Sequence, residues 1–407
     1  MKRADGFRFA LMSALCGCFV YAASSGIRSN LAVLIGPLAA EGAFSYAQIS
    51  MCAAAGQFVY GISQILFGLV CARDGVRRAL LWGCALMASG LGMVPFCHGT
   101  ASLMVFLGIL FHAGTGAASF GIVMIAVNAL LGGASPSWVS GIVSAGTGAG
   151  TIVLPPIIAW SVSRIGAGET FAALGIFCAA IVPACIALAP RGAGRSDAAS
   201  SGMGGAMALL AAACRSKVFA AACIAFTIDG FHMGIIQTHF FSQLQEMGLS
   251  ESLSSLAYSI IGAATMAGAI ACGVVLKTAP APSVLARLFI ARAPIALCLA
   301  ALMPRSAAIL LSFSLLLGLT MDASVAPVAS IVRGVMGEGA FGVLFGFAYA
   351  CHQVGGFLST ALGGLAQGRE GIALIWGLDA ISCAAAAVLI IAALASGARR
   401  RGAASAA

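Results

Sequence analysis

Charged residues are scarce in this sequence. They make up 8% of its 407 residues, whereas soluble domains usually carry about 25%. Hydrophobic residues make up 61%, and a soluble core could not bury that much apolar surface, which indicates that the solvent is lipid. The sequence lacks a phosphate-binding G-x-x-x-x-G-K-[ST] stretch, so ATP-driven pumping is not expected. It also lacks a recognisable nucleophile or metal cluster, so we expect neither an enzyme nor a bound metal or other cofactor.

Cysteine and basic residues are present without the spacing that would give them a special role. The 14 cysteines are scattered singly through apolar runs, apart from Cys16 and Cys18, and we interpret them as small buried thiols. The formal net charge of +9 arises from residues in short turns between the apolar runs. Because these residues do not line one face or arm, a nucleic-acid partner is not expected.

About twelve apolar runs reach the ~20 residues that a bilayer crossing requires. Their length and continuity favour helices over a barrel. We therefore predict an all-α membrane protein with about twelve transmembrane helices in two six-helix bundles. The predicted spans cover approximately 8–38, 47–71, 79–97, 101–130, 138–163, 170–190, 218–246, 252–276, 284–303, 307–331, 340–366 and 371–396.

The stretch 191–217, rich in charge, Gly and Ser, separates two apolar halves. We expect residues 1–190 to form one bundle, 191–217 a cytoplasmic linker, and 218–407 a second bundle with a basic tail. The N-terminus resembles a secretory signal, but its apolar character resumes after Arg28, so we interpret it as a retained first span.

The distribution of Lys and Arg predicts the orientation. With the N-terminus inside, sixteen of these residues fall on the cytoplasmic side, against Arg164, Arg305 and Arg369 on the other. This positive-inside bias places both termini in the cytoplasm and the chain in the cytoplasmic (inner) membrane as a multi-pass protein.

The turn after the second span resembles the loop signature of the major facilitator superfamily, roughly G-x-x-x-D-R-x-G-x-R. The matching residues are Gly68, Arg73, Gly75 and Arg77, whereas Ala72 stands in the place of the signature's acid. In that superfamily the acid helps to latch the outward-open state, so the resemblance implies a latch that is weaker or rebuilt here. Asp74 lies two positions later.

The stretch 144–156 is similar to the fifth span of monocarboxylate and oxalate:formate carriers. The stretches 229–239 and 347–355 resemble the seventh and eleventh spans of related bacterial carriers. The resemblance implies two six-helix halves, each an inverted pair of three-helix repeats, with the substrate held between them at the midplane. We expect a monomer to be the functional unit.

Arg28 is a candidate substrate anchor, because an ionisable residue inside the bilayer costs ~2.5 kcal/mol or more. A guanidinium can bind a carboxylate bidentately. The alternative is that Arg28 snorkels to the outer headgroups. Gln57, on the second span, is a candidate cavity-lining group.

By the same resemblance, His352 takes the place of the oxalate:formate carrier's substrate-binding lysine. Tyr349 and Gln353 flank it, and Gln237 joins them as a candidate substrate-binding residue. Ala269 stands in the place of that family's eighth-span arginine. The resemblance therefore favours a monocarboxylate or a zwitterion over a dicarboxylate. The alternative is a packing histidine bonded to a carbonyl group.

Asp229, His232 and His239 fall near one face of the seventh span. We expect this polar stripe to face a water-filled cavity and to take part in proton coupling, since histidine titrates near neutral pH. A structural ion pair is the alternative. Asp322 is a further proton-coupling candidate, although mutual neutralisation with Arg292 is the favoured interpretation. Asp379 and His112 are interpreted as packing or local hydrogen-bonding groups.

Together these features predict a secondary transporter that moves a small, monocarboxylate-like organic anion by alternating access, with proton coupling or exchange. Arg28 and His352 would bind the carboxylate from opposite halves. The partners would be the lipid bilayer, a small-molecule substrate and protons. The alternative is proton-driven efflux of amphipathic drug-like compounds, for which Asp229 and Asp322 could serve, although the fifth span lacks a G-P-x-x-G-G pattern.

Overall fold

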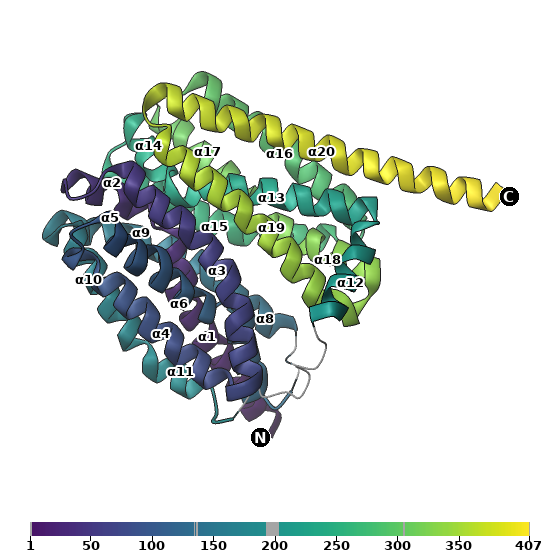
Figure 1. The fold of residues 1–407 in the computed structure, drawn as a ribbon, viewed down its shortest axis with the longest axis horizontal. Coiled ribbons are helices and arrows are strands. Elements are labelled where there is room, and N and C mark those ends of the chain that lie inside the picture. The colour runs from purple at the N-terminus through teal and green to yellow at the C-terminus, as the bar shows by residue number, and fades with distance from the viewer. Residues whose placement is uncertain (1, 134, 136, 193–202, 304–305, 407) are drawn as a thin grey trace. The chain divides into compact units, whose positions relative to one another are not determined.

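The computed structural model describes residues 2–133, 135, 137–192, 203–303 and 306–406, and all their regular elements are helical (Figure 1). Ten helical segments are long and apolar enough to cross a membrane. Two more of the expected spans correspond to α4 (Val76–Gly92), with 17 residues, and α19 (Glu338–Leu365), with 28. The predicted all-α membrane fold is confirmed.

Large apolar side chains cover the outward faces of many of these helices. Trp160, Ile176 and Ile381 are examples, each at least 63% exposed. Exposure on this scale would be unstable in water but is favourable against lipid tails. Most cysteines are buried thiols, as expected.

The chain divides into two compact units, which we call unit 1 (residues 1–200 and 240–242) and unit 2 (residues 201–239 and 243–407). Within the predicted linker 191–217, residues 193–202 lie outside the described part of the chain. The segment that follows is helix α12 (Met203–Cys214). Alanine and leucine, both strong helix formers, dominate this segment and account for a helix where the sequence suggested a linker.

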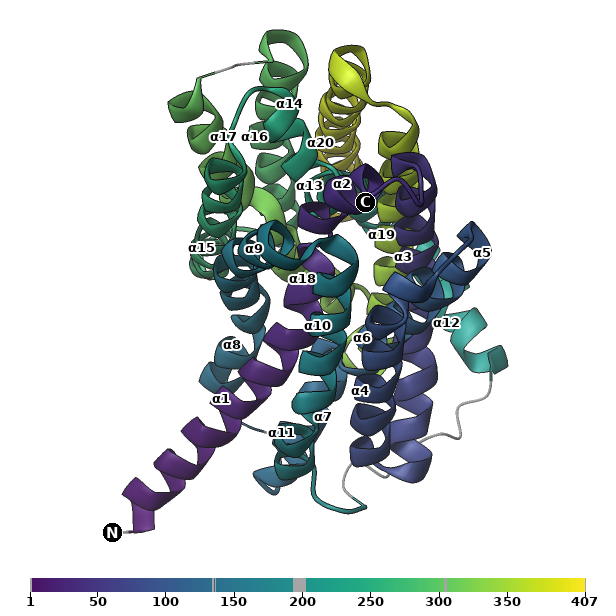
Figure 2. The same cartoon turned by 90° about the vertical axis from the view of Figure 1, so that its left-hand side faces the viewer.

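Unit 1 contains the helices of the first half. They are α1 (Lys2–Ser29), α2 (Ala32–Ala40), α3 (Tyr46–Asp74), α4, η1 (Val94–Phe96), α5 (Thr100–Leu103), η2 (Met104–Phe111), α6 (His112–Ala117), α7 (Phe120–Leu130), α8 (Ser137–Ser144), α9 (Gly146–Ile165), α10 (Ala167–Ala180) and α11 (Val182–Leu188). Helix α1 packs along α8 and α9 (Figure 2).

Glycine lets α1 and α9 pack closely together. A Cβ added at Gly150 would lie 2.7 Å from the Cα of Gly26, and one added at Gly146 would lie 2.6 Å from the carbonyl oxygen of Cys18. A side chain at either position would therefore force the two backbones apart.

The first span is broken, whereas the sequence predicted one continuous run over 8–38. The break falls at Asn30 and Leu31, where the Asn30 side-chain amide donates a hydrogen bond to the carbonyl of Gly26 at 2.6 Å. Beyond it, α2 leads to Glu41, whose carboxylate accepts hydrogen bonds from the backbone N–H groups of Ala167 and Gly168. This carboxylate caps the N-terminus of α10, where the helix dipole favours negative charge.

The predicted fourth span, 101–130, also departs from a regular α-helix. Its segment η2 is a π-helix, and the next residue, His112, places Nδ1 2.9 Å from the carbonyl oxygen of Leu107. The ring packs directly against Gly56, where an added Cβ would lie 2.2 Å from Nδ1. His112 is thus a local hydrogen-bonding group, as predicted.

Unit 2 contains the helices of the second half. They are α12, α13 (Lys217–Thr238), α14 (Phe240–Glu246), α15 (Glu251–Val275), α16 (Ala281–Leu302), α17 (Ala307–Met321), η3 (Asp322–Ser324), α18 (Val325–Met336), α19 and α20 (Gly368–Ala406). The first three residues of α14 group with unit 1.

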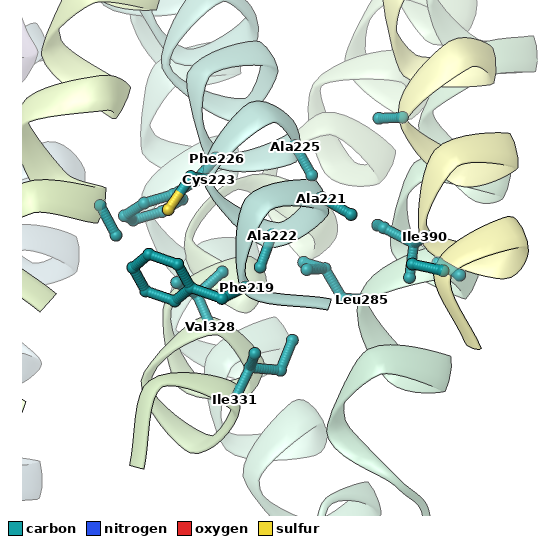
Figure 3. Packing of buried hydrophobic residues seen from close by; sticks show 14 of the residues in the cluster. Phe219, Ala221, Ala222, Cys223, Ala225, Phe226, Leu285, Val328, Ile331 and Ile390 are labelled. Carbon is teal, nitrogen blue, oxygen red and sulfur yellow. The ribbon is translucent and has the colours of Figure 1, made fainter. Parts of the chain in front are cut away.

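A hydrophobic core joins helices α12, α13, α16, α18, α19 and α20. Phe219 and Phe226 of α13 pack with Leu285 of α16, Ile331 of α18 and Ile390 of α20 (Figure 3). Small residues such as Ala221 and Ala225 lie between them and let the helices approach closely. This packing fixes which face of α13 meets each neighbour.

Candidate functional site

Backbone contact between α13 and α19 positions the polar groups of unit 2. A Cβ added at Gly230 would lie 1.8 Å from the carbonyl oxygen of His352, and one added at Gly355 would lie 1.8 Å from that of Thr227. Only glycine allows so close a crossing. It brings Asp229, next to Gly230, beside the side chain of His352.

Asp229 lies at the centre of a buried charge network. Its Oδ1 accepts a hydrogen bond from Nη1 of Arg292, and its Oδ2 lies 3.3 Å from Nε2 of His352. Arg292 is fully buried and also donates to the backbone carbonyls of Thr320 and Met321. A buried guanidinium needs such partners because its desolvation is costly.

The sequence paired Arg292 with the wrong carboxylate. Asp322 was the favoured counter-ion, but Arg292 forms its ion pair with Asp229. Asp322 opens η3 and is half-buried. Hydrophobic periodicity could not decide between Asp229 and Asp322, because it does not determine which face of α16 packs against α13.

A second pair joins α13 to α20. Nδ1 of His232 lies 2.7 Å from Oδ2 of Asp379, and both side chains are fully buried. The sequence assigned Asp379 only a packing or local hydrogen-bonding role, so this ion-pair partner was missed. The signal that could have identified it was a carboxylate inside an apolar span.

Cys383 lies beside this pair, with Sγ 3.8 Å from Oδ1 of Asp379. Possible metal-ligand atoms of His232, Asp379 and Cys383 lie within 4.8 Å of one another. We interpret these three side chains as a hydrogen-bonded group and not as a metal site, because Nδ1 of His232 and Oδ2 of Asp379 contact each other at 2.7 Å.

The polar stripe on α13 does not face water. Asp229, His232 and His239 are each at most 1% exposed, and each contacts a different partner on neighbouring helices. His239, just after α13, places Nε2 2.9 Å from the carbonyl oxygen of Thr360. The predicted exposure of this face to a water-filled cavity is therefore wrong. Asp229 and His232 form ion pairs, and their part in proton coupling stays a prediction.

Of the other substrate-binding candidates of unit 2, Tyr349 contacts His352. The Tyr349 ring stacks on the imidazole with centroids 5.4 Å apart, and Phe226 packs against it at 4.7 Å. Nε2 of His352 also lies 3.3 Å from the sulfur of Met233. Gln353 and Gln237 are both buried.

Arg28 occupies the last turn of α1 in unit 1 and is 8% exposed. Its Nη1 donates a hydrogen bond to Oε1 of Gln57 at 3.3 Å, and its guanidinium carbon lies 4.3 Å from the centroid of the Tyr60 ring. Both partners come from α3, one turn apart. The structure thus brings Arg28 and Gln57 together, and their burial does not fit a snorkelling arginine.

The turn between α3 and α4 carries the signature residues. Gly75 has φ +94° and ψ 151°, a conformation that essentially only glycine adopts. Asp74 forms an ion pair of 3.1 Å with Arg78. Arg73 is exposed, Arg77 is half-buried, and a Cβ added at Gly68 would meet nothing within 4 Å.

Residues 17–360 match the sequence profile of the Major Facilitator Superfamily, which covers most of the chain. The chain belongs to the Major Facilitator Superfamily. A crystal structure of a variant of the nucleoside transporter NupG is similar, with a TM-score of 0.77 over 94% of this chain and 99% of that chain. The two sequences are 13% identical, so this likeness shows the fold alone. No curated protein matches the chain.

Membership of the Major Facilitator Superfamily identifies the protein as a multi-pass membrane transporter rather than an enzyme. The resemblance drawn from Gly68, Arg73, Gly75 and Arg77 is confirmed at the level of the superfamily. The monocarboxylate branch stays a prediction.

Proposed function

We propose that the protein is a secondary transporter of a small, monocarboxylate-like organic anion across the cytoplasmic membrane. It works by alternating access as a monomer, with both termini in the cytoplasm and with proton coupling or exchange. The observation that carries the proposal is Arg28, a permanent positive charge buried in the first membrane span.

The surroundings of Arg28 suit a carboxylate ligand. The Gln57 amide and the Tyr60 ring, two of the groups that contact its guanidinium, are neutral. Arginine presents several N–H donors in a planar fork, so a bidentate carboxylate contact is compatible with the Gln57 hydrogen bond. We therefore assign Arg28 the role of the anion anchor, with Gln57 as its positioning residue.

The charge arrangement of unit 2 disfavours drug efflux. A cationic drug would need a carboxylate, but Asp229 already binds Arg292 and His352. A drug that displaced Arg292 from Asp229 would leave the buried guanidinium without a counter-ion. This would cost about 3–5 kcal/mol. Because His352 contacts Asp229, we include it among the proton-coupling groups of unit 2 in our proposal.

Uptake into proteoliposomes tests the proposal. The panel contains lactate, pyruvate, formate, oxalate, a nucleoside, an amino acid and an organic cation, each with and without an inward proton gradient. We expect gradient-stimulated uptake of a monocarboxylate. Uptake of the nucleoside or the cation alone would contradict the anion assignment.

Variants at the anchor sharpen this test. We expect Arg28→Ala and His352→Ala each to abolish uptake while the protein still inserts, and Arg28→Lys to retain a fraction of it, because lysine keeps the charge and loses the fork. Arg164→Ala is the matched control, since it removes an exposed arginine of the same unit. Undiminished uptake by Arg28→Ala would sink the proposal.

A further inference from the structure

Among the residues of unit 2 whose burial is described, the buried charges do not balance. Arg292 contributes one positive charge, whereas Asp229 and Asp379 contribute two negative charges, and all three side chains are fully buried. The two histidines that contact these carboxylates, His232 and His352, are neutral unless protonated. With both histidines neutral the cluster carries one net negative charge away from water.

One bound proton would neutralise this cluster. An uncompensated buried charge is costly, and proteins avoid it by binding a proton or a counter-ion. Asp229 already has Arg292 as its counter-ion, whereas the described partners of Asp379 are His232 and the Cys383 thiol. The charge deficit therefore falls on the pair formed by His232 and Asp379.

We propose that the His232–Asp379 pair binds the one proton that the transporter carries in each cycle, and that Asp379 is a proton-coupling residue. This inference rests on the proposed function and names its coupling ion and stoichiometry. When the pair releases its proton, the N–H bond of the imidazolium breaks and water accepts the proton. A neutral imidazole then remains beside a charged carboxylate.

The groups around the pair allow it to act as a unit. On α20, Cys383 contacts Asp379, and the Trp376 ring lies edge-on to His232 at 6.1 Å. On α13, Asp229 precedes His232 by less than one turn. The nearest cation is Arg292 of α16, and His352 of α19 contacts Asp229. The other arginines of α16 and α18, Arg287 and Arg333, are exposed.

Neutrality explains why one proton would accompany one anion. In the proposal this proton resides on the His232–Asp379 pair and makes the network neutral, so the barrier to the change of access is lower in the protonated state. A monocarboxylate bound at Arg28 would bring one negative charge with it. Transport of one proton with one monocarboxylate would move no net charge across the membrane.

The test compares two transport modes of Asp379→Asn in proteoliposomes, with labelled lactate and pyruvate as substrates. The substitution is isosteric and removes one negative charge, so the network becomes neutral without a proton. We expect counterflow exchange to persist, while gradient-driven accumulation falls from about tenfold, the value for one proton at a pH difference of one unit, to none. Cys383→Ala is the matched control, because it removes a contact of the same carboxylate without changing charge, and it should still accumulate substrate.

The outcomes separate the two proposals. Absence of counterflow for every anion in the wild type would refute the proposed function. Wild-type counterflow together with normal accumulation by Asp379→Asn would refute only the role of the pair. Should Asp379→Asn fail to fold, the proton count of the wild type decides: an internal pH dye must report one proton per anion, and any other ratio overturns the inference.

Discussion

Replacing Gly230 by alanine should separate α13 from α19. The added Cβ would lie 1.8 Å from the carbonyl oxygen of His352 and 2.7 Å from its carbonyl carbon. Both helices are continuous there, so the clash is with rigid backbone and no side chain can rotate to relieve it. Moving the contact from 1.8 Å to an ordinary distance of about 3.4 Å requires a local separation of about 1.6 Å.

That separation would break the charge network. The 3.3 Å contact between Nε2 of His352 and Oδ2 of Asp229 would lengthen to about 4.9 Å, beyond the reach of a hydrogen bond. Overpacking of this kind costs about 1–3 kcal/mol. The better helix propensity of alanine offsets up to about 1 kcal/mol. We therefore expect Gly230→Ala to be less stable by roughly 1–2 kcal/mol.

Thermal unfolding in detergent and gradient-driven uptake in proteoliposomes measure these two effects. Gly346→Ala is the matched control, because Gly346 lies on the same α19 and a Cβ added there meets nothing within 4 Å. It should be at least as stable as the wild type and transport normally. A Gly230→Ala protein that unfolds at the wild-type temperature and accumulates substrate normally would show that the α13–α19 crossing does not hold the network together.

Three further substitutions test the packing and the charges, each by thermal unfolding of the purified protein. Asp229→Asn should lower the free energy of unfolding by about 3–5 kcal/mol, because Arg292 is left buried without its carboxylate partner. The double variant Asp229→Asn/Arg292→Gln should regain much of this stability. Equal instability of the single and double variants would contradict the pairing. Glu41→Ala should cost about 0.5–2 kcal/mol by uncapping α10, and an unchanged midpoint would speak against the cap. Gly75→Ala should cost about 1–3 kcal/mol from its positive φ, whereas Gly68→Ala, at an open position, should cost little.

The sequence determined where the helices lie, because lipid offers the backbone no hydrogen-bond partner and an apolar run of sufficient length must be helical. Ionisable residues inside the spans, such as Arg28, Asp229 and His352, were also identifiable from the sequence as candidate functional residues. A charge in the bilayer is costly and is therefore rare outside functional or structural sites. The break at Asn30 was not identifiable, because the sequence is apolar again from Leu31 to Leu38 and predicts one continuous span.

Only the tertiary structure decided how the charges pair. Asp229 and Arg292 are 63 residues apart, and His232 and Asp379 are 147 apart, so no local periodicity relates them. Their pairing depends on which helix faces meet, and that is fixed by the backbone contacts at Gly230 and by the core around α13. Hydrophobic periodicity predicts that a helix is buried in lipid or protein, but it does not predict which neighbouring helix each polar side chain contacts.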